Sequence, residues 1–166
     1  MKKKFNYFVL IITILVLIFS LAGCSFAIGN YKVDNLSVSK KKPNNFYYTN
    51  LLAKNLTLSS SCKAIVLDTN FYKEKDLVKE DVDTIKKFTK ELNKQNFVDK
   101  PSDLPAKPIY KLYFTFDKEK YIINVYNERY LSIYPWDGSY PMDYIDMNSI
   151  SPSNNINSLC KYLIPR

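Results

Sequence analysis

The chain of 166 residues contains no histidine, and this absence removes whole classes of chemistry. Histidine is the commonest metal ligand in proteins and the commonest general base near neutral pH. Histidine-dependent catalytic triads and zinc-protease motifs are therefore excluded. Glycine is also scarce, with three residues in all, so the sequence lacks a glycine-rich loop of the kind that holds phosphate groups. No spacing of acidic residues or cysteines indicates a metal site, and we expect no metal and no cofactor.

What the chain has instead is a strongly patterned leader. Lys2 to Lys4 precede a run from 8 to 19 that is almost entirely Phe, Val, Leu and Ile. A basic start, a short apolar stretch and small residues at its end are typical of a secretory signal. The leader ends with Leu21-Ala22-Gly23-Cys24, which resembles the lipobox of bacterial lipoproteins.

That resemblance implies cleavage before Cys24 and a diacylglyceryl group on its sulfur. It places the protein at the cell membrane, anchored by lipid on the extracytoplasmic face, so the membrane is one expected partner. Two acyl chains suffice for stable anchoring. The alternative is a single membrane-spanning helix, because the run from Phe5 to Ala22 is close to the lower length limit for a span. The cysteine directly after Leu-Ala-Gly favours the lipoprotein.

The charge balance limits which other classes of partner we expect. Without the three leader lysines, 21 basic residues stand against 16 acidic ones. Such a surplus suits an anionic lipid surface or a wall polymer, but the lysines are spread along the chain and form no block typical of nucleic-acid binding. We expect no nucleic-acid partner, and a partner protein or a cell-wall polymer stays open.

Apolar periodicity predicts a signal peptide at 1–23, a tether at 24–43 and a single α+β domain at 44–166. The predicted helices run from Asn44 or Asn45 to about Leu56, over Lys79 to Asn96, and from a Ser151-Pro152 cap to a stop at Pro165. A strand at 64–67 and an antiparallel meander over 109–147 predict a sheet of four or five strands, with two to three helices packed on one face.

The meander also predicts its own register. A four-residue loop at 117–120 places Phe114 opposite Ile123, and a three-residue loop at 127–129 places Val125 opposite Leu131. Prolines 135 and 141 around the Asp137-Gly138 turn predict that the last strand is an edge.

The same alternation places a set of tyrosines on the face opposite the core. With Trp136 and Tyr140 at the turn, they form an aromatic surface, and aromatic residues of this kind are enriched in binding patches. The alternatives are a stabilising cross-strand aromatic ladder or a face covered by the helix at 44–56. The predicted ligand-binding residues are Tyr113, Tyr126, Tyr130, Tyr134, Trp136 and Asp137.

Two further interpretations concern acids and cysteines. Paired carboxylates among Asp137, Asp143 and Asp146 are the minimum for glycoside hydrolysis, so a cell-wall-directed hydrolase is the alternative to a non-catalytic binding module. No nucleophile motif accompanies these acids, and turn aspartates usually stabilise turns, so we assign no catalytic residue. Cys62 and Cys160 form a disulfide or stay as free thiols, since Cys160 also fits the apolar stripe of the last helix.

The folded part carries a second resemblance. The runs Tyr134-Pro135-Trp136-Asp137-Gly138 and Cys160-Lys161-Tyr162-Leu163-Ile164-Pro165 resemble small uncharacterised lipoproteins, with domains of unknown function, from low-GC Gram-positive bacteria. This resemblance brings no activity with it. It agrees with a membrane-anchored binding module for a partner protein, a cell-wall polymer or a small ligand.

Overall fold

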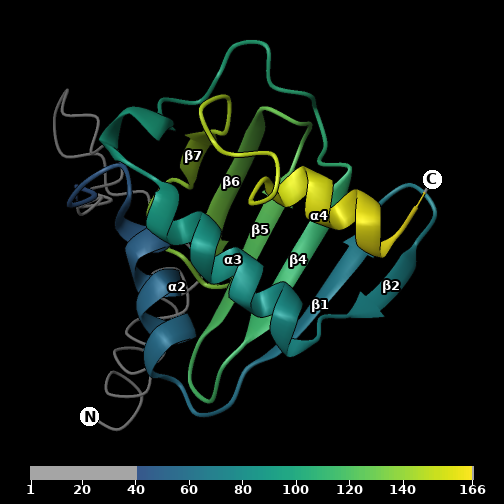
Figure 1. Cartoon of the computed structure of the whole chain (residues 1–166). Helices are drawn as coiled ribbons and strands as arrows, with labels where there is room; N and C mark the ends of the chain where they lie inside the picture. Colours follow the sequence, from purple (N-terminus) through teal and green to yellow (C-terminus); the bar gives the residue numbers. More distant parts are fainter. Residues whose placement is uncertain (1–40, 166) are drawn as a thin grey trace, which may run out of the picture. The chain divides into compact units, whose positions relative to one another are not determined.

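A computed structural model describes residues 41–165, which form a seven-stranded antiparallel sheet with three α-helices on one face (Figure 1). The leader, Cys24 and the predicted tether up to residue 40 lie outside the described residues. The predicted α+β class is confirmed, and the sheet has more strands than the four or five expected.

The two unpredicted strands are short and lie at the edges, because the strands pair in the order β2-β1-β4-β5-β6-β7-β3. β2 consists of four exposed charged residues and β3 of only two residues, so neither has the apolar alternation that reveals a strand. β3 pairs with β7, and the prediction that the last strand of the meander is an edge is therefore wrong. The strands are β1 (Lys63–Asp68), β2 (Lys73–Asp76), β3 (Phe97–Val98), β4 (Tyr110–Thr115), β5 (Lys120–Val125), β6 (Tyr130–Pro135) and β7 (Asp143–Asp146).

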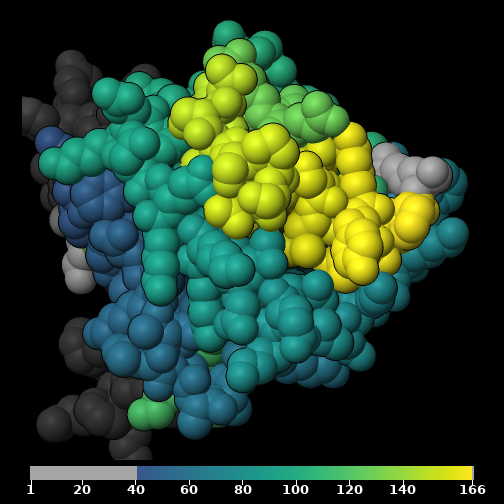
Figure 2. Space-filling model, in the orientation of Figure 1, coloured from purple at the N-terminus to yellow at the C-terminus, as the bar shows by residue number. Residues whose placement is uncertain are grey.

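The helices bury the apolar stripes that their sequences predict. Leu52, Phe88 and Cys160, one from each helix, are fully buried against the sheet. In the space-filling view, the helices and the segment before the last one hide the sheet behind them (Figure 2). The helices are α2 (Tyr47–Leu58), α3 (Lys79–Glu91) and α4 (Ile156–Leu163), with a 3-10 turn η1 (Lys94–Asn96) after α3.

α4 begins later than predicted. Asn155 caps it, because its Oδ1 accepts hydrogen bonds from the backbone N–H groups of Asn157 (2.9 Å) and Ser158 (3.3 Å). Ser151, the predicted cap, instead donates its backbone N–H and its hydroxyl to the Glu91 carboxylate at the end of α3 (2.7 and 3.0 Å). Ser151 therefore binds Glu91, a residue distant in sequence, and does not cap α4.

One hairpin has the predicted register and the other does not. Val125 faces Leu131 in the second hairpin, as predicted. In the first hairpin, Phe114 faces Tyr121 instead of Ile123. The turn begins at Phe116 and not at Asp117, and the Phe116 N–H donates to the Glu119 carbonyl (2.9 Å). A shift of two residues keeps every side chain on its face, so Phe114 and Ile123 are still fully buried.

Candidate functional site

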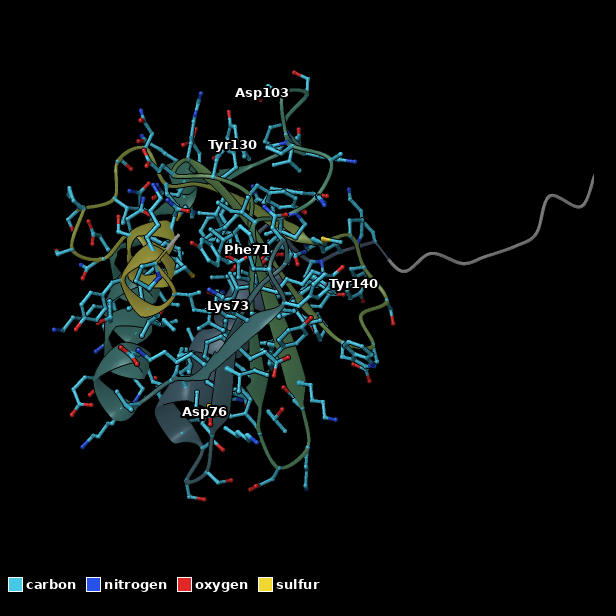
Figure 3. All side chains as sticks on the ribbon, turned by 90° about the vertical axis from the view of Figure 1, so that its right-hand side faces the viewer. Phe71, Lys73, Asp76, Asp103, Tyr130 and Tyr140 are labelled. Atoms are coloured by element: carbon cyan, nitrogen blue, oxygen red, sulfur yellow. The ribbon has the colours of Figure 1, made fainter. Side chains whose placement is uncertain are left out.

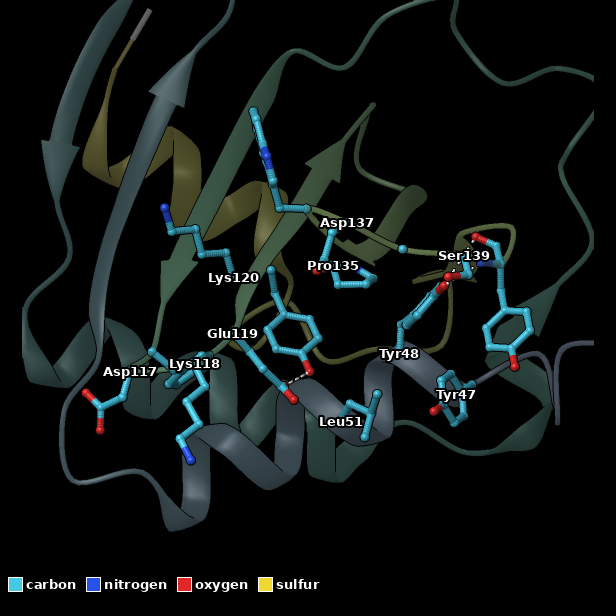
Figure 4. A pocket seen from close by; sticks show the side chains of 15 residues that line it. Tyr47, Tyr48, Leu51, Asp117, Lys118, Glu119, Lys120, Pro135, Asp137 and Ser139 are labelled. Carbon is cyan, nitrogen blue, oxygen red and sulfur yellow. Dashed lines mark hydrogen bonds between the residues drawn. The ribbon is translucent and has the colours of Figure 1, made fainter. Parts of the chain in front are cut away.

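A cleft of about 630 Å³ opens at one end of the sheet, where α2 meets two turns (Figure 4). Tyr47, Tyr48 and Leu51 of α2 form one side, and the turns between β4 and β5 and between β6 and β7 form the others. The volume lies within the range of roughly 300–1,000 Å³ that is common for ligand sites. The lining residues beyond α2 are Phe116, Asp117, Lys118, Glu119, Lys120, Tyr121, Pro135, Trp136, Asp137, Gly138, Ser139 and Tyr140.

Aromatic rings dominate the cleft wall. The rings of Tyr47 and Tyr140 meet edge to face, with centroids 5.6 Å apart and planes at 87°, and the rings of Tyr48 and Tyr140 lie 6.2 Å apart. Edge-to-face pairs of this kind are favourable and hold the rings in place. Trp136 is 69% exposed, so its ring is available for contact with a ligand.

The Tyr48 hydroxyl holds the β6–β7 turn against α2. It accepts a hydrogen bond from the Tyr140 N–H (2.8 Å) and donates one to the Tyr140 carbonyl (3.3 Å). A Cβ on Gly138 would lie 2.9 Å from this hydroxyl, so any other residue there would force the turn or the Tyr48 side chain to shift. Burial is the largest cause that raises the pKa of Tyr48, so the hydroxyl keeps the proton it donates.

Glu119 in the β4–β5 turn presents an oriented carboxylate to the cleft. Its Oε2 accepts hydrogen bonds from the Asn55 side-chain amide of α2 (2.8 Å) and from the Tyr121 hydroxyl, the bond drawn in Figure 4. Burial, followed by the bond to Glu119, raises the pKa of Tyr121 far above its usual value. The phenol is therefore the donor in this pair, and the carboxylate is the acceptor.

The rim of the cleft carries charges of both signs. Lys118 and Lys120 stand among Asp117, Glu119 and Asp137. Neither sign prevails strongly, so the cleft does not select a highly charged ligand by its overall potential.

The three acids considered for hydrolysis do not form one site. Asp143 faces the helices and is fully buried, where it accepts hydrogen bonds from the Thr49 N–H (2.7 Å) and hydroxyl (2.8 Å) and pairs with Lys42 (2.5 Å). Burial raises the pKa of Asp143, although Lys42 and Thr49 oppose the shift. Asp146 binds Arg129 (2.8 Å), and Asp137 is exposed in its turn. The structure therefore does not support the predicted pairing of carboxylates.

The four predicted tyrosines lie on the sheet face that is turned away from the helices. Tyr113 and Tyr134 are half-buried and flank Ile122 in one row, as the alternation predicts. Tyr126 and Tyr130 are only 8% and 7% exposed. Because α2 packs into the core on the opposite face, the alternative that this helix covers the tyrosines is wrong.

Neighbouring side chains account for the burial of this pair. The Tyr126 hydroxyl lies 3.5 Å from the Ser132 hydroxyl, and the Arg129 guanidinium lies 4.8 Å from the centre of the Tyr130 ring. Asp103, in the connection between β3 and β4, lies at the same end of the sheet as Tyr130 (Figure 3). Burial is the largest cause of the raised pKa of Tyr130; Arg129 opposes the shift and Asp103 adds to it.

The predicted binding residues thus fall into two groups. Trp136 and Asp137 line the cleft, whereas the four tyrosines belong to the separate outer face of the sheet. Tyr48 fits the apolar spacing of the first predicted helix and Tyr121 the alternation of its strand, so the sequence predicts both as core residues and marks no role for Glu119. Both tyrosines are indeed buried, and only the packing of α2 against two turns shows that they also line the cleft.

Cys62 and Cys160 are both free, so of the two alternatives the structure has the free thiols and not the disulfide. Cys62 is exposed in the segment before β1, and Cys160 is buried on the inner side of α4. Burial raises the pKa of both thiols. The apolar stripe of α4 is sufficient to explain Cys160.

Residues 41–165 contain no cluster of three or more acidic, cysteine or histidine side chains that would hold a metal ion. None of the helices in this range is both long and apolar enough to cross a membrane.

Fold and site together define a small α+β domain with an aromatic cleft at one end of its sheet. The chain belongs to the family DUF4883, a domain of unknown function, whose model matches residues 42–160. It is similar to a solved structure described as a "putative lipoprotein" from Clostridium perfringens, at 32% identity and a TM-score of 0.67. That match covers 75% of this chain and 99% of the other. A comparison with curated proteins found no match.

Both findings agree with the second resemblance that the sequence suggested. The matched family is one of unknown function, and the similar structure comes from a low-GC Gram-positive bacterium. The leader that resembles a lipobox, and the lipid anchor that this resemblance implies, fall outside the described residues.

Proposed function

We propose that the protein is a lipoprotein, anchored through Cys24 on the extracytoplasmic face of the cell membrane, whose domain is a non-catalytic binding module. The leader ending in Leu21-Ala22-Gly23-Cys24 supports the anchor. The description of the similar Clostridium perfringens protein supports the same class.

The single observation that carries the binding role is the aromatic cleft. Its walls are held before any ligand arrives, by the Tyr48 bonds to Tyr140 on one side and the Asn55 bond to Glu119 on the other. A site whose groups are already ordered loses little conformational entropy on binding. Trp136 and Asp137 are the proposed contact residues at the β6–β7 turn.

The outer tyrosine face is the proposed extension of this surface. Tyr113 and Tyr134 keep part of their rings at the surface, and Tyr134 lies on the strand that leads to Trp136. Tyr126 and Tyr130 lie deeper and contribute chiefly by supporting their neighbours.

A crosslinking pull-down from intact cells tests this function. The full-length parent should recover a specific partner, and Trp136→Ala should recover much less of it because an exposed ring contributes to binding and little to stability. Tyr162→Ala is the matched control, since Tyr162 on α4 is 78% exposed and does not line the cleft. Equal recovery by all three proteins would contradict the proposal.

A further inference from the structure

We infer that the ligand of the cleft is a neutral carbohydrate chain, an inference that rests on the proposed binding function. Three features of the cleft carry it: the aromatic wall, the oriented carboxylate of Glu119 and the balance of charges on the rim. The first two features match different parts of a sugar ring, and the third bears on the net charge of the ligand.

The aromatic wall matches the apolar side of a sugar. A pyranose ring has C–H groups on its faces and hydroxyls around its edge, so a flat ring is a suitable partner for one of its faces. Trp136 supplies an exposed ring, while Tyr47 and Tyr140 are fixed against each other at 5.6 Å. Aromatic walls with a few placed polar groups are typical of sites that orient a small ligand.

Glu119 matches the hydroxyl edge. Asn55 and Tyr121 both donate to its Oε2, and neither of these bonds uses the second oxygen, Oε1. A carboxylate that accepts from a hydroxyl forms a charge-assisted hydrogen bond, roughly twice as strong as a neutral one. Ser139 and Asp137 on the opposite turn add further polar groups.

The rim charges favour a neutral ligand over a highly charged one. Two lysines and three acids surround the cleft, so an anionic polymer gains no net attraction there. A neutral polyhydroxylated chain needs no such attraction and uses groups of both signs as donors and acceptors.

The chain's single tryptophan makes a direct test feasible, because Trp136 is the only source of tryptophan emission. The full-length protein, in a detergent without a sugar headgroup, is titrated with N-acetylglucosamine tetramer, cellotetraose and maltotetraose. At least one of them should shift the emission of Trp136 saturably, whereas anionic polygalacturonate should not. Glu119→Gln should weaken that binding about tenfold, as expected for loss of a charge-assisted hydrogen bond.

Glu128→Gln is the control, because Glu128 is an exposed carboxylate that pairs with Lys161 and does not line the cleft. It should bind as the parent does, and circular dichroism should show both variants folded. The inference is overturned if no neutral sugar shifts the emission, if polygalacturonate binds equally well, or if Glu119→Gln binds like the parent. Partner recovery that still depends on Trp136 would then leave the proposed function standing, whereas recovery independent of Trp136 removes the function itself.

Discussion

At the scale of single residues, Tyr48 links the core to the cleft. Its ring is buried on α2, with the Lys42 ammonium 5.3 Å from the ring centre, and its hydroxyl binds both the N–H and the carbonyl of Tyr140. The ring therefore belongs to the core and the hydroxyl to the site. The apolar spacing of α2 predicts the first role, and the second depends on a turn more than ninety residues away.

Replacing Tyr48 by Phe tests the second role alone, since the ring is kept. We expect a loss of about 1–2 kcal/mol in the free energy of unfolding, because two polar groups of Tyr140 lose their partner. Urea unfolding measures it, with Tyr162→Phe as the exposed control. A loss no larger than that of the control would show that the hydroxyl does not hold the turn.

At the scale of elements, Glu91 joins α3 to the segment before α4. Its carboxylate accepts from the Asn154 side-chain amide (2.6 Å) as well as from Ser151. The bond from Asn154, followed by the backbone bond from Ser151, lowers the pKa of Glu91 below its usual value. Ser151 is thus bound to Glu91, and α4 begins at the Asn155 cap instead.

The lowered pKa of Glu91 predicts a pH dependence of stability with a definite sign. The folded state holds this carboxylate charged, so its contribution is present above the ordinary glutamate pKa of about 4.3 and is lost as the pH falls through the lower folded pKa. Glu91→Gln should therefore be less stable than the parent at neutral pH, with the difference shrinking in acid.

Urea midpoints measured at a series of pH values, for the parent, Glu91→Gln and Glu80→Gln, check this. Glu80 is exposed in the first turn of α3 and should behave like the parent. A constant gap between the parent and Glu91→Gln at every pH would contradict the account.

Most of the helices and strands are predictable from the sequence, and a few of their details are not. The stripes of the helices and the hairpin around 127–129 follow from side-chain spacing, because one face of each element is buried. The first hairpin differs because a period of two cannot distinguish registers that are two residues apart. β2 is not predicted because its exposed residues are all charged. The start of α4 is predicted too early because Ser151 binds Glu91 and does not act as the cap.

The site is less predictable than the fold for a related reason. Trp136 and Asp137, which line the cleft, are predictable from the sequence because they stand in a turn with a strong local pattern. Glu119, Tyr48 and Tyr121 line the cleft only because α2 packs beside the β4–β5 and β6–β7 turns. That arrangement is tertiary and leaves no spacing in the sequence.

At the scale of the whole molecule, the anchor and the cleft belong to one proposal. Lys42, near the start of the described residues, pairs with the buried Asp143, which ties this end of the described chain to the sheet. The residues from Cys24 to this point connect the proposed lipid to the binding module.

The proposed lipid anchor predicts fatty-acid labelling at Cys24. Cells grown with an alkyne-bearing fatty acid should label the parent protein, and Cys24→Ala should lose the label because its sulfur is the proposed acylation site. Cys62→Ala is the matched control and should label like the parent, since Cys62 belongs to the folded domain. Equal labelling of Cys24→Ala and the parent would remove the lipoprotein assignment.

The central claim, that a ligand occupies the aromatic cleft at the cell surface, is tested most directly by photo-crosslinking in intact cells. A photoreactive amino acid is placed at Lys118 on the cleft rim, at Tyr113 on the outer sheet face, or at Tyr162 on α4. The account predicts a strong, specific adduct from position 118, a weaker one from 113 and none from 162. An adduct from 162 with none from 118 would contradict it.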